Sequence, residues 1–459
     1  MLKVPLFILL FCNGLANRMA LSETSAVSQK KIIIVGGGPV GLYFAALMLH
    51  KDPSVKIEIL EKESTPSVNA FGLGVGSRMQ HRLSDVPGLK ERAISISANV
   101  EYLNIPLVSR NDLTEQMGRF LLENTNCKLT NGEECESIDL GRREITTRSG
   151  RRIQYDLILA ADGVNSPIRR QLVEQKGFQE EHYLYDNSWK ALKLPKQPEL
   201  NADSFKPFRH PSVLGGRVLP SAPEGHILLM FWKSNGSQNP TGIRTVQDLK
   251  LMVTEAMQDK FRKKNSIRNM LGMEMASKIV KKDRKIVYDE AALEQFVNAR
   301  AGRTHHLQMP QYHYQDSVAL IGDSAHSFNS LLGQGCATGF ESSCTLVNSL
   351  TSSANLSDAL SNYSQVASAE AHAISECSLI SFAMSAGILM KLKMAPLIIW
   401  SMMCGTSLIK QIRDITIPFS QIMKDNTRIL KLCRREFEKQ RLPFEDYSKT
   451  RSSPAVNSP

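Results

Sequence analysis

The stretch "KIIIVGGGPVGLYFAALMLH", residues 31–50, constrains the fold of this chain more than any other. Its β-branched run, residues 32–35, predicts a strand buried in a parallel sheet. Gly36, Gly38 and Gly41 follow at once as G-x-G-x-x-G and open an apolar helix. We expect Gly36 to allow a tight turn, Gly38 to admit a pyrophosphate beside the backbone, and Gly41 to let helix and strand pack closely. The positive end of the helix dipole would then face the phosphates.

An acidic residue ends the next apolar run. The segment "VKIEIL" leads into Glu61, about 20 residues beyond the glycines, where a dinucleotide fold places a carboxylate on the ribose hydroxyls. Such a carboxylate disfavours a bound 2′-phosphate. We therefore predict a tightly held nucleotide of the adenosine type, either FAD or NAD, and place Lys62 in the same site.

Two later strand-to-turn units favour FAD. "YDLILAADGVNSPIRR" carries Asp162 and Gly163, and "DSVALIGDSAHSFNSLLGQGCATGFESS" carries Asp323 and Gly335. A carboxylate at a strand end can accept a hydrogen bond from a ribityl hydroxyl, and a glycine-rich helix start can offer amides to the flavin ring. Either unit alone could be an ordinary connection between a strand and a helix. Three such units in this order indicate one FAD.

These motifs resemble the fingerprints of the FAD-dependent aromatic hydroxylases, the flavin monooxygenases with a p-hydroxybenzoate-hydroxylase-like fold. G-x-G-x-x-G, D-G-x-x-S-x-x-R and G-D-x-x-H followed by G-Q-G are all present. Within the family, "VSRNDL", "WKALKLP", "LLGQGCATGFES" and "HAISECS" are most similar to the kynurenine 3-monooxygenases. The resemblance spans roughly residues 31–435. It implies that NADH or NADPH reduces FAD, and that O2 then oxygenates an aromatic or apolar small molecule through a C4a-hydroperoxyflavin.

The resemblance also distributes residues over the FAD molecule. Val40 and Glu61 would hold the adenosine half, and Cys135 would meet adenine through its backbone. Arg110 would reach the flavin-side phosphate or ring, and Asp323 the ribityl chain. The two residues after Gly335 would donate amides to the pyrimidine edge. No catalytic side chain and no metal are predicted, because the flavin carries the chemistry. The predicted cofactor-binding residues are Gly36, Gly38, Val40, Gly41, Glu61, Lys62, Arg110, Cys135, Asp162, Gly163, Asp323, Gly335, Cys336 and Ala337.

The substrate pocket departs from the kynurenine pattern. That pattern has an arginine- and tyrosine-bearing segment before "VSRNDL" that clamps the substrate carboxylate, and "AISISANVEYLNIPLVSRNDL" is too short to hold it. A carboxylate needs a buried arginine fork. We therefore expect an apolar pocket and poor binding of free kynurenine. The predicted pocket residues, which replace other residues of the family pattern, are Leu331, Leu332, Ser381 and Ile398.

Other residues and reactions compete with this interpretation. Four arginines could replace the clamp, although a solvated charge is the favoured interpretation of each: Arg78, Arg82, Arg209 and Arg217. A flavin-dependent halogenase would share the fold, but its Trp-x-Trp-x-Ile-Pro phrase is missing, since Lys190 and Ala191 follow Trp189. A third hypothesis is an FAD-binding protein that has lost turnover. His305, His306 and His313 fit structural packing better than metal ligation.

Composition excludes several classes. The net charge is +11, but lysine and arginine are scattered without a basic repeat, so no nucleic-acid partner is predicted. None of the eight cysteines forms a C-x-x-C pair, so the sequence predicts no zinc site. We expect an α/β fold, with a discontinuous Rossmann-like FAD-binding domain at 29–171 and 309–352. A β-sheet substrate domain would occupy 172–308, and a helical cover 353–445.

The two ends and one internal stretch bear on location. Residues 1–28 have the outline of a secretory signal peptide, so we expect the secretory pathway or an organelle. Residues 446–459 have the composition of a disordered tail. Residues 378–409 are apolar but broken by two lysines and a proline. We favour buried helices there over a peripheral membrane contact, which stays as the alternative. No prediction is made of the oligomeric state.

Overall fold

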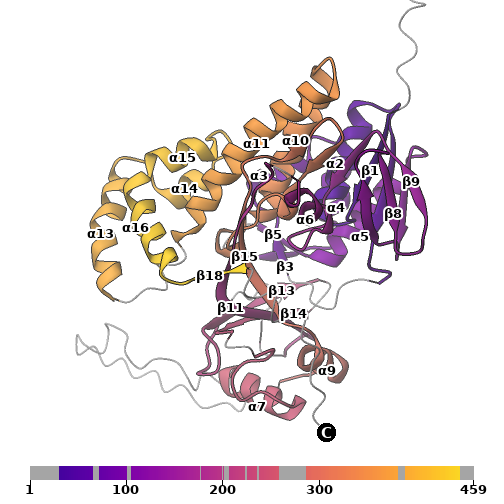
Figure 1. Ribbon diagram of the computed structural model, residues 1–459. Coiled ribbons are helices and arrows are strands. Elements are labelled where there is room, and N and C mark those ends of the chain that lie inside the picture. The colour runs from indigo at the N-terminus through magenta and orange to yellow at the C-terminus, as the bar shows by residue number, and fades with distance from the viewer. Residues whose placement is uncertain are drawn as a thin grey trace, which may run out of the picture.

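The computed structural model describes residues 30–444 except 66–71, 101–104, 176, 199, 201–205, 223–224, 235–236, 258–285 and 381–387. The predicted leader, the predicted tail and Ser381 lie outside the described residues. Figure 1 shows a parallel sheet flanked by helices, an antiparallel sheet beside it, and a group of C-terminal helices that lies beside α11. The α/β fold predicted from the sequence is therefore confirmed.

The parallel sheet has the strand order β16-β17-β10-β1-β2-β6. The residues 32–35 predicted as a strand are buried in β1, as expected for the centre of such a sheet. β10 and β2 flank β1, both in parallel, and only the short β16 runs antiparallel at the edge. The strands are β1 (Lys31–Val35), β2 (Lys56–Glu61), β6 (Cys127–Asn131), β10 (Leu157–Ala160), β16 (His313–Tyr314) and β17 (Val318–Leu320).

Helices and two small sheets surround the parallel sheet. The apolar helix predicted after the glycines is α2, and ten of its thirteen residues are buried, because it lies between the sheet and α10. The helices are α2 (Pro39–Lys51), α3 (Ser77–Leu83), α4 (Leu89–Ala93), α5 (Arg110–Leu122), α6 (Pro167–Val173), α10 (Gly335–Ser352) and α11 (Leu356–Ser378), with short 3-10 turns at η2 (Gly322–Ser324) and η3 (Ser330–Leu332). The small sheets join β3 (Gly72–Gly74), β4 (Ala98–Val100) and β5 (Ile105–Ser109), and β7 (Cys135–Asp139), β8 (Glu144–Thr147) and β9 (Arg152–Gln154).

The antiparallel sheet is inserted in the chain between β10 and β17. One face packs on two helices, and the other packs at one end on Leu107 of β5. On that second face, the indole of Trp189 lies over Gly302 on the neighbouring strand, so closely that no Cβ would fit on this glycine. The strands are β11 (Glu181–Leu194), β12 (Lys206–Phe208), β13 (Gly215–Ser221), β14 (Gly225–Trp232) and β15 (Gly302–Gln308), and the helices are α7 (Val246–Met257) and α9 (Glu290–Asn298).

The C-terminal helices form a group that we call the cover: α13 (Ile388–Met403), α14 (Leu408–Arg413), α15 (Phe419–Asp425) and α16 (Thr427–Glu438), followed by β18 (Arg441–Pro443). The inner side of the cover belongs to one apolar cluster, which we call the cover cluster. This cluster includes Tyr185, Phe328, Cys377, Phe419 and Phe437.

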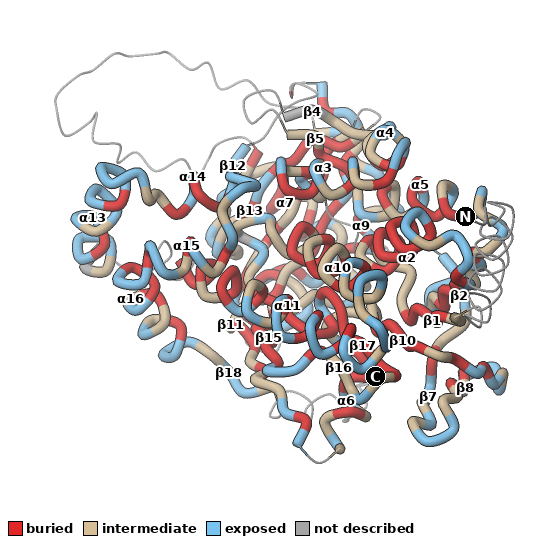
Figure 2. The backbone as a smooth tube through the Cα atoms, turned by 90° about the horizontal axis from the view of Figure 1, so that it is seen from above, coloured by how far each residue is buried: buried red, intermediate tan, exposed pale blue. Residues whose placement is uncertain are grey.

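The outer side of α13 contradicts one prediction. Buried helices were expected across residues 378–409, but Figure 2 shows α13 largely exposed. Trp400 is 64% exposed and Met403 77% exposed, because α13 lies at the rim of the cover. Among the helices that the structure describes, none is both long enough and apolar enough to cross a bilayer.

Candidate functional site

The three sequence motifs meet at one edge of the parallel sheet. β17, β10 and β1 are neighbours and run in the same direction, so their carboxyl ends lie side by side. Backbone hydrogen bonds continue the ladder past the strand ends, from Ala161 N to Val35 O over 2.8 Å and from Ile321 N to Ala160 O over 3.0 Å. The residues that follow each strand are therefore held in register next to one another.

The first turn can be made only with glycine. Gly36 has a φ of 106°, and a Cβ on it would overlap the carbonyl oxygen of Ala161. A Cβ on Gly41 would overlap the carbonyl oxygen of Gly36. Gly38 lies beside Arg110 from the start of α5, whose Nη2 would be 3.5 Å from a Cβ on that glycine. A guanidinium thus stands next to the N-terminus of α2, where backbone amides and the helix dipole attract phosphate.

Glu61 is fixed at the same turn. Its Oε2 accepts a hydrogen bond from Gly37 N over 2.7 Å, and its Oε1 accepts one from Glu63 N over 2.9 Å. The carboxylate therefore lies at the glycine turn and retains further lone pairs for hydroxyl donors. Lys62 is placed differently, because its side chain is 60% exposed and pairs with Glu63 at the surface.

Two aspartates end the neighbouring strands. Dense packing raises the pKa of Asp162 to about 6, although Ser166 donates a hydrogen bond to its Oδ2 over 2.8 Å. Its Oδ1 has no partner among the described residues. Burial also raises the pKa of Asp323, although the positive charge of Arg110 offsets part of this effect. The Asp323 side chain nevertheless keeps solvent-accessible surface, so a ligand can reach it. These carboxylates fit the hydroxyl groups of a ribityl chain, which donate hydrogen bonds.

The start of α10 completes this edge. The helix begins at Gly335 after Gln334, which makes no side-chain cap, so the first amides of the helix remain available to a ligand. Cys336 lies close to Asp323, and burial and this carboxylate together raise the pKa of its thiol to about 12. Ala337 is buried in the next position of the first turn. A helix start of this kind suits the electron-rich pyrimidine edge of a flavin.

Further predicted residues lie around this edge. A Cβ on Gly322 would be 3.2 Å from Val40 Cγ1, so the side chain of Val40 faces η2. Cys135 begins β7, where burial and then the charge of Asp162 raise the pKa of its thiol to about 12. Gly163 has a φ of 77° in the turn after Asp162. The structure thus gathers the predicted cofactor residues near the carboxyl edge, although the side chain of Lys62 is exposed at the surface.

Arg169 links the second and third motifs. Its guanidinium is 1% exposed and donates to Ser324 O over 3.1 Å and to Val164 O over 2.6 Å. Glu180, which the sequence analysis did not single out, accepts from its Nε over 2.7 Å. The arginine therefore fixes the turns of β10 and β17 relative to each other.

Among the predicted substrate residues that the structure describes, Leu332 and Ile398 have different surroundings. Leu332 is partly buried against the cover cluster, and Leu331 shares its 3-10 turn. Ile398 lies on the outer part of α13 and is 38% exposed. Of the four arginines, Arg78 and Arg82 are engaged with protein groups, whereas Arg209 and Arg217 are exposed.

No protein-family model matches the chain. The chain is 22% identical to kynurenine 3-monooxygenase of Dictyostelium discoideum, over 70% of each chain. It is 23% identical to the enzyme of the same name from Flavobacterium psychrophilum, over 77% of this chain and 80% of the relative. Its fold is similar to that of 2-methyl-3-hydroxypyridine-5-carboxylic acid oxygenase, with a TM-score of 0.56 and 17% identity, covering 77% of this chain and 90% of the other. The chain is thus similar in sequence to kynurenine 3-monooxygenases and similar in fold to 2-methyl-3-hydroxypyridine-5-carboxylic acid oxygenase.

Proposed function

We propose that this chain is an FAD-dependent monooxygenase that takes electrons from NADH or NADPH and hydroxylates an aromatic or apolar small molecule with O2. The observation that most supports this function is that a glycine turn, Arg110 and two strand-end carboxylates lie close together at one edge of the sheet. In this proposal, residues 29–171 and 309–352 form the FAD-binding domain and residues 172–308 the substrate domain.

The residues present suit the parts of FAD. Arg110 and the amides of α2 would neutralise the pyrophosphate, and Glu61 would accept from the ribose hydroxyls. Asp323 would accept from the ribityl chain, while the amides after Gly335 would face the pyrimidine edge. When bound, FAD supplies the redox chemistry, and the chain's task is to orient the substrate and exclude water.

The surroundings favour a substrate without a carboxylate. Arg78 and Arg82, two of the arginines that could replace the carboxylate clamp, already serve backbone carbonyls and Glu341. The loop that precedes Gly335 contributes Phe328 and Leu332, and both lie in or against the apolar cover cluster. An ionised carboxylate would lose its hydration there without gaining a fork of donors.

The test is a comparison of substrates on the purified protein. FAD content is first read from its absorbance, and NADH or NADPH oxidation is then followed with neutral aromatics, aromatic acids and kynurenine. We expect neutral aromatics to accelerate oxidation at least tenfold and to gain one oxygen by mass. Acceleration by kynurenine alone would contradict the apolar pocket. A halide-dependent product would indicate a halogenase, and bound FAD with no stimulated oxidation would indicate a binding protein.

A peripheral membrane contact through the cover forms the second part of the proposal. Lys391 and Lys393 lie exposed on α13, near apolar side chains that are also exposed. Such a helix can lie in the interface of an anionic membrane, with its lysines near the headgroups. The exposed apolar side chains of α13 are Leu392, Ile398, Ile399, Trp400, Met402 and Met403.

Vesicle binding tests this contact. We expect the protein to sediment with vesicles that contain phosphatidylserine and the emission of Trp400 to shift to the blue, and we expect Met402→Ser with Met403→Ser to weaken both effects. Binding that is unchanged in this double variant would contradict the contact. The predicted leader is tested separately, by fusing residues 1–28 to a fluorescent protein and locating it in cells.

A further inference from the structure

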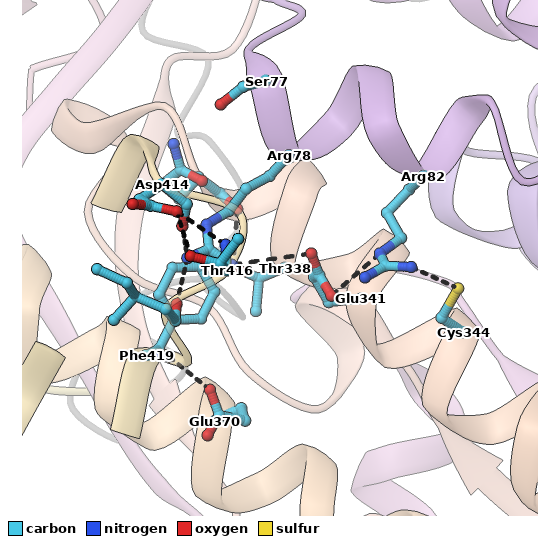
Figure 3. A network of polar contacts seen from close by, with 12 residues as sticks. Ser77, Arg78, Arg82, Thr338, Glu341, Cys344, Glu370, Asp414, Thr416 and Phe419 are labelled. Carbon is cyan, nitrogen blue, oxygen red and sulfur yellow. Dashed lines mark hydrogen bonds and ion pairs between the residues drawn. The ribbon is translucent and has the colours of Figure 1, made fainter. Parts of the chain in front are cut away.

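Arg78 joins the FAD-binding part of the chain to the cover. It lies on α3, directly after β3, and its side chain is 6% exposed. Nε donates to Ile412 O over 3.0 Å, and Nη2 donates to Asp414 O and Ile417 O, each over 2.5 Å. Figure 3 shows the guanidinium reaching into the segment that connects α14 to α15. One side chain thus satisfies three backbone carbonyls of the cover.

Neighbouring contacts hold the same segment. Ser77 Oγ donates to Arg413 O over 2.7 Å, and Glu370 of α11 accepts from Phe419 N over 2.7 Å. The guanidinium carbon of Arg78 lies 4.3 Å from the centre of the Phe419 ring, as in a cation–π contact. The connection is therefore held from α3 and α11 together.

Only an arginine provides this set of contacts. Its planar fork carries five donors, whereas a lysine ammonium is a point charge on a flexible stem. Burial lowers the pKa of Arg78, while Glu341 of α10 offsets part of this effect from 3.9 Å. Removal of the fork would leave the buried carbonyl of Ile412 and the partly buried carbonyls of Asp414 and Ile417 without this donor, and an unsatisfied buried carbonyl costs more than the net value of a hydrogen bond.

The segment held by Arg78 shares an apolar cluster with the loop that precedes Gly335, which we call the flavin-facing loop. Phe419, under the guanidinium, belongs to the cover cluster together with Phe328, and Leu332 packs against that cluster. Both Phe328 and Leu332 lie in the loop that ends at Gly335, where α10 begins. The position of the cover against this loop therefore depends on the contacts of Arg78.

We propose that Arg78 is a positioning residue that keeps the cover closed against the flavin-facing loop, so that solvent does not reach the reduced flavin. This rests on the proposed function. In coupled turnover, NAD(P)H, H⁺, O2 and substrate R–H give NAD(P)⁺, R–OH and H2O. With an open cover, NAD(P)H, H⁺ and O2 give NAD(P)⁺ and H2O2, because both electrons leave to oxygen without forming the C–O bond.

The test compares Arg78→Lys and Arg78→Gln with Arg82→Lys as the matched control. Arg82 is on the same helix and pairs with Glu341 and Asp85, and none of its described contacts reaches the connection between α14 and α15. In FAD-loaded protein without turnover, we expect iodide to quench flavin fluorescence at least twofold more strongly in both Arg78 variants, with faster amide exchange across residues 408–420. The control should match the wild type.

The two proposals fail in different ways. In turnover, the H2O2 formed per NAD(P)H should rise severalfold in Arg78→Lys while the FAD content stays that of the wild type. Quenching and exchange that are unchanged in both Arg78 variants would overturn the role of Arg78, whatever the reaction. An unchanged H2O2 ratio in a variant that does turn over would overturn it as well. A wild type that binds FAD but oxidises no substrate would overturn the proposed function, and the quenching result would still decide whether Arg78 closes the cover.

Discussion

Val40 on α2 lies against Gly339 on α10, so closely that a methyl group on Gly339 would stand 2.5 Å from Val40 Cγ2. Gly339 is one turn inside α10, and Val40 is the second residue of α2. This contact brings the starts of both helices to the same edge of the sheet. The amides assigned to the pyrophosphate and those assigned to the flavin ring are thereby placed relative to each other.

We predict that Gly339→Ala weakens FAD binding at least tenfold and lowers the melting temperature of the loaded protein. Alanine favours a helix over glycine by up to about 1 kcal/mol, but overpacking at a rigid contact costs about 1–3 kcal/mol and should dominate. Fluorescence titration of the apoprotein with FAD measures the effect. Gly215→Ala is the control, because a Cβ there would meet nothing within 4 Å. Equal FAD affinity in the two variants would refute the importance of this contact.

Glu61→Gln should reduce the affinity for FAD about tenfold, equivalent to about 1.4 kcal/mol. The amide NH2 of glutamine cannot accept from the backbone, so either Gly37 N or Glu63 N loses its acceptor, and the charge opposite the ribose hydroxyls is lost. Titration of the apoprotein against FAD and FMN checks this. Since FMN lacks the adenosine half, its weaker binding should not change, and an equal loss for both would place Glu61 elsewhere in the cofactor site.

His306→Phe should remove an acid-sensitive contribution to stability. His306 is fully buried, its ring nitrogens have no partner among the described residues, and burial together with nearby cations lowers its pKa to about 3. The unfolded chain, with a histidine pKa of about 6.5, binds the proton first. Stability from this group is therefore complete above about pH 6.5 and falls below it. Urea unfolding should show the wild type losing about 1–2 kcal/mol relative to His306→Phe between about pH 7 and pH 5. Parallel curves for the two proteins would contradict the prediction.

Lys190 should make the stability of the fold depend on pH in the alkaline range. Its Nζ donates to Phe296 O over 2.6 Å and to Asn239 Oδ1 over 2.8 Å, and burial lowers its pKa to about 8. Below that pH the charged form carries its full desolvation cost, and the folded state gains relative to an unfolded lysine as the pH rises from about 8 to about 10.4. We expect wild type to gain about 1–2 kcal/mol over Lys190→Met between about pH 7.5 and pH 9.5, measured by urea unfolding. A difference that does not vary with pH would show that Lys190 stays charged throughout.

Much of the fold could be predicted because its signals are local. The β-branched run, the glycine turn and Glu61 lie within one short stretch, and each has a single physical interpretation in a parallel sheet. Each of the strands β1, β10 and β17 ends in a strand-to-turn motif, and this shared pattern also predicts that their ends meet. Exposure of α13 could not be read in the same way, because the apolar composition of residues 378–409 does not show which neighbour covers them.

The remaining site features depend on contacts between distant residues. Arg78 was interpreted as a solvated charge or a clamp, and its carbonyl partners lie more than 330 positions away. Glu180 belongs to no sequence motif, and only its pairing with Arg169 in the structure marks it. Neither pairing has a spacing rule, so only the packed structure reveals it.

The order of the parallel sheet has a consequence for biosynthesis. β10 needs β17 as its neighbour, yet the ribosome makes strands β11 to β15 of the antiparallel sheet between them. The first two motifs of the proposed FAD site therefore leave the ribosome before the third, and pairings so remote in sequence form slowly. Shortage of riboflavin during growth should consequently raise the yield of aggregated chains rather than of soluble, colourless protein.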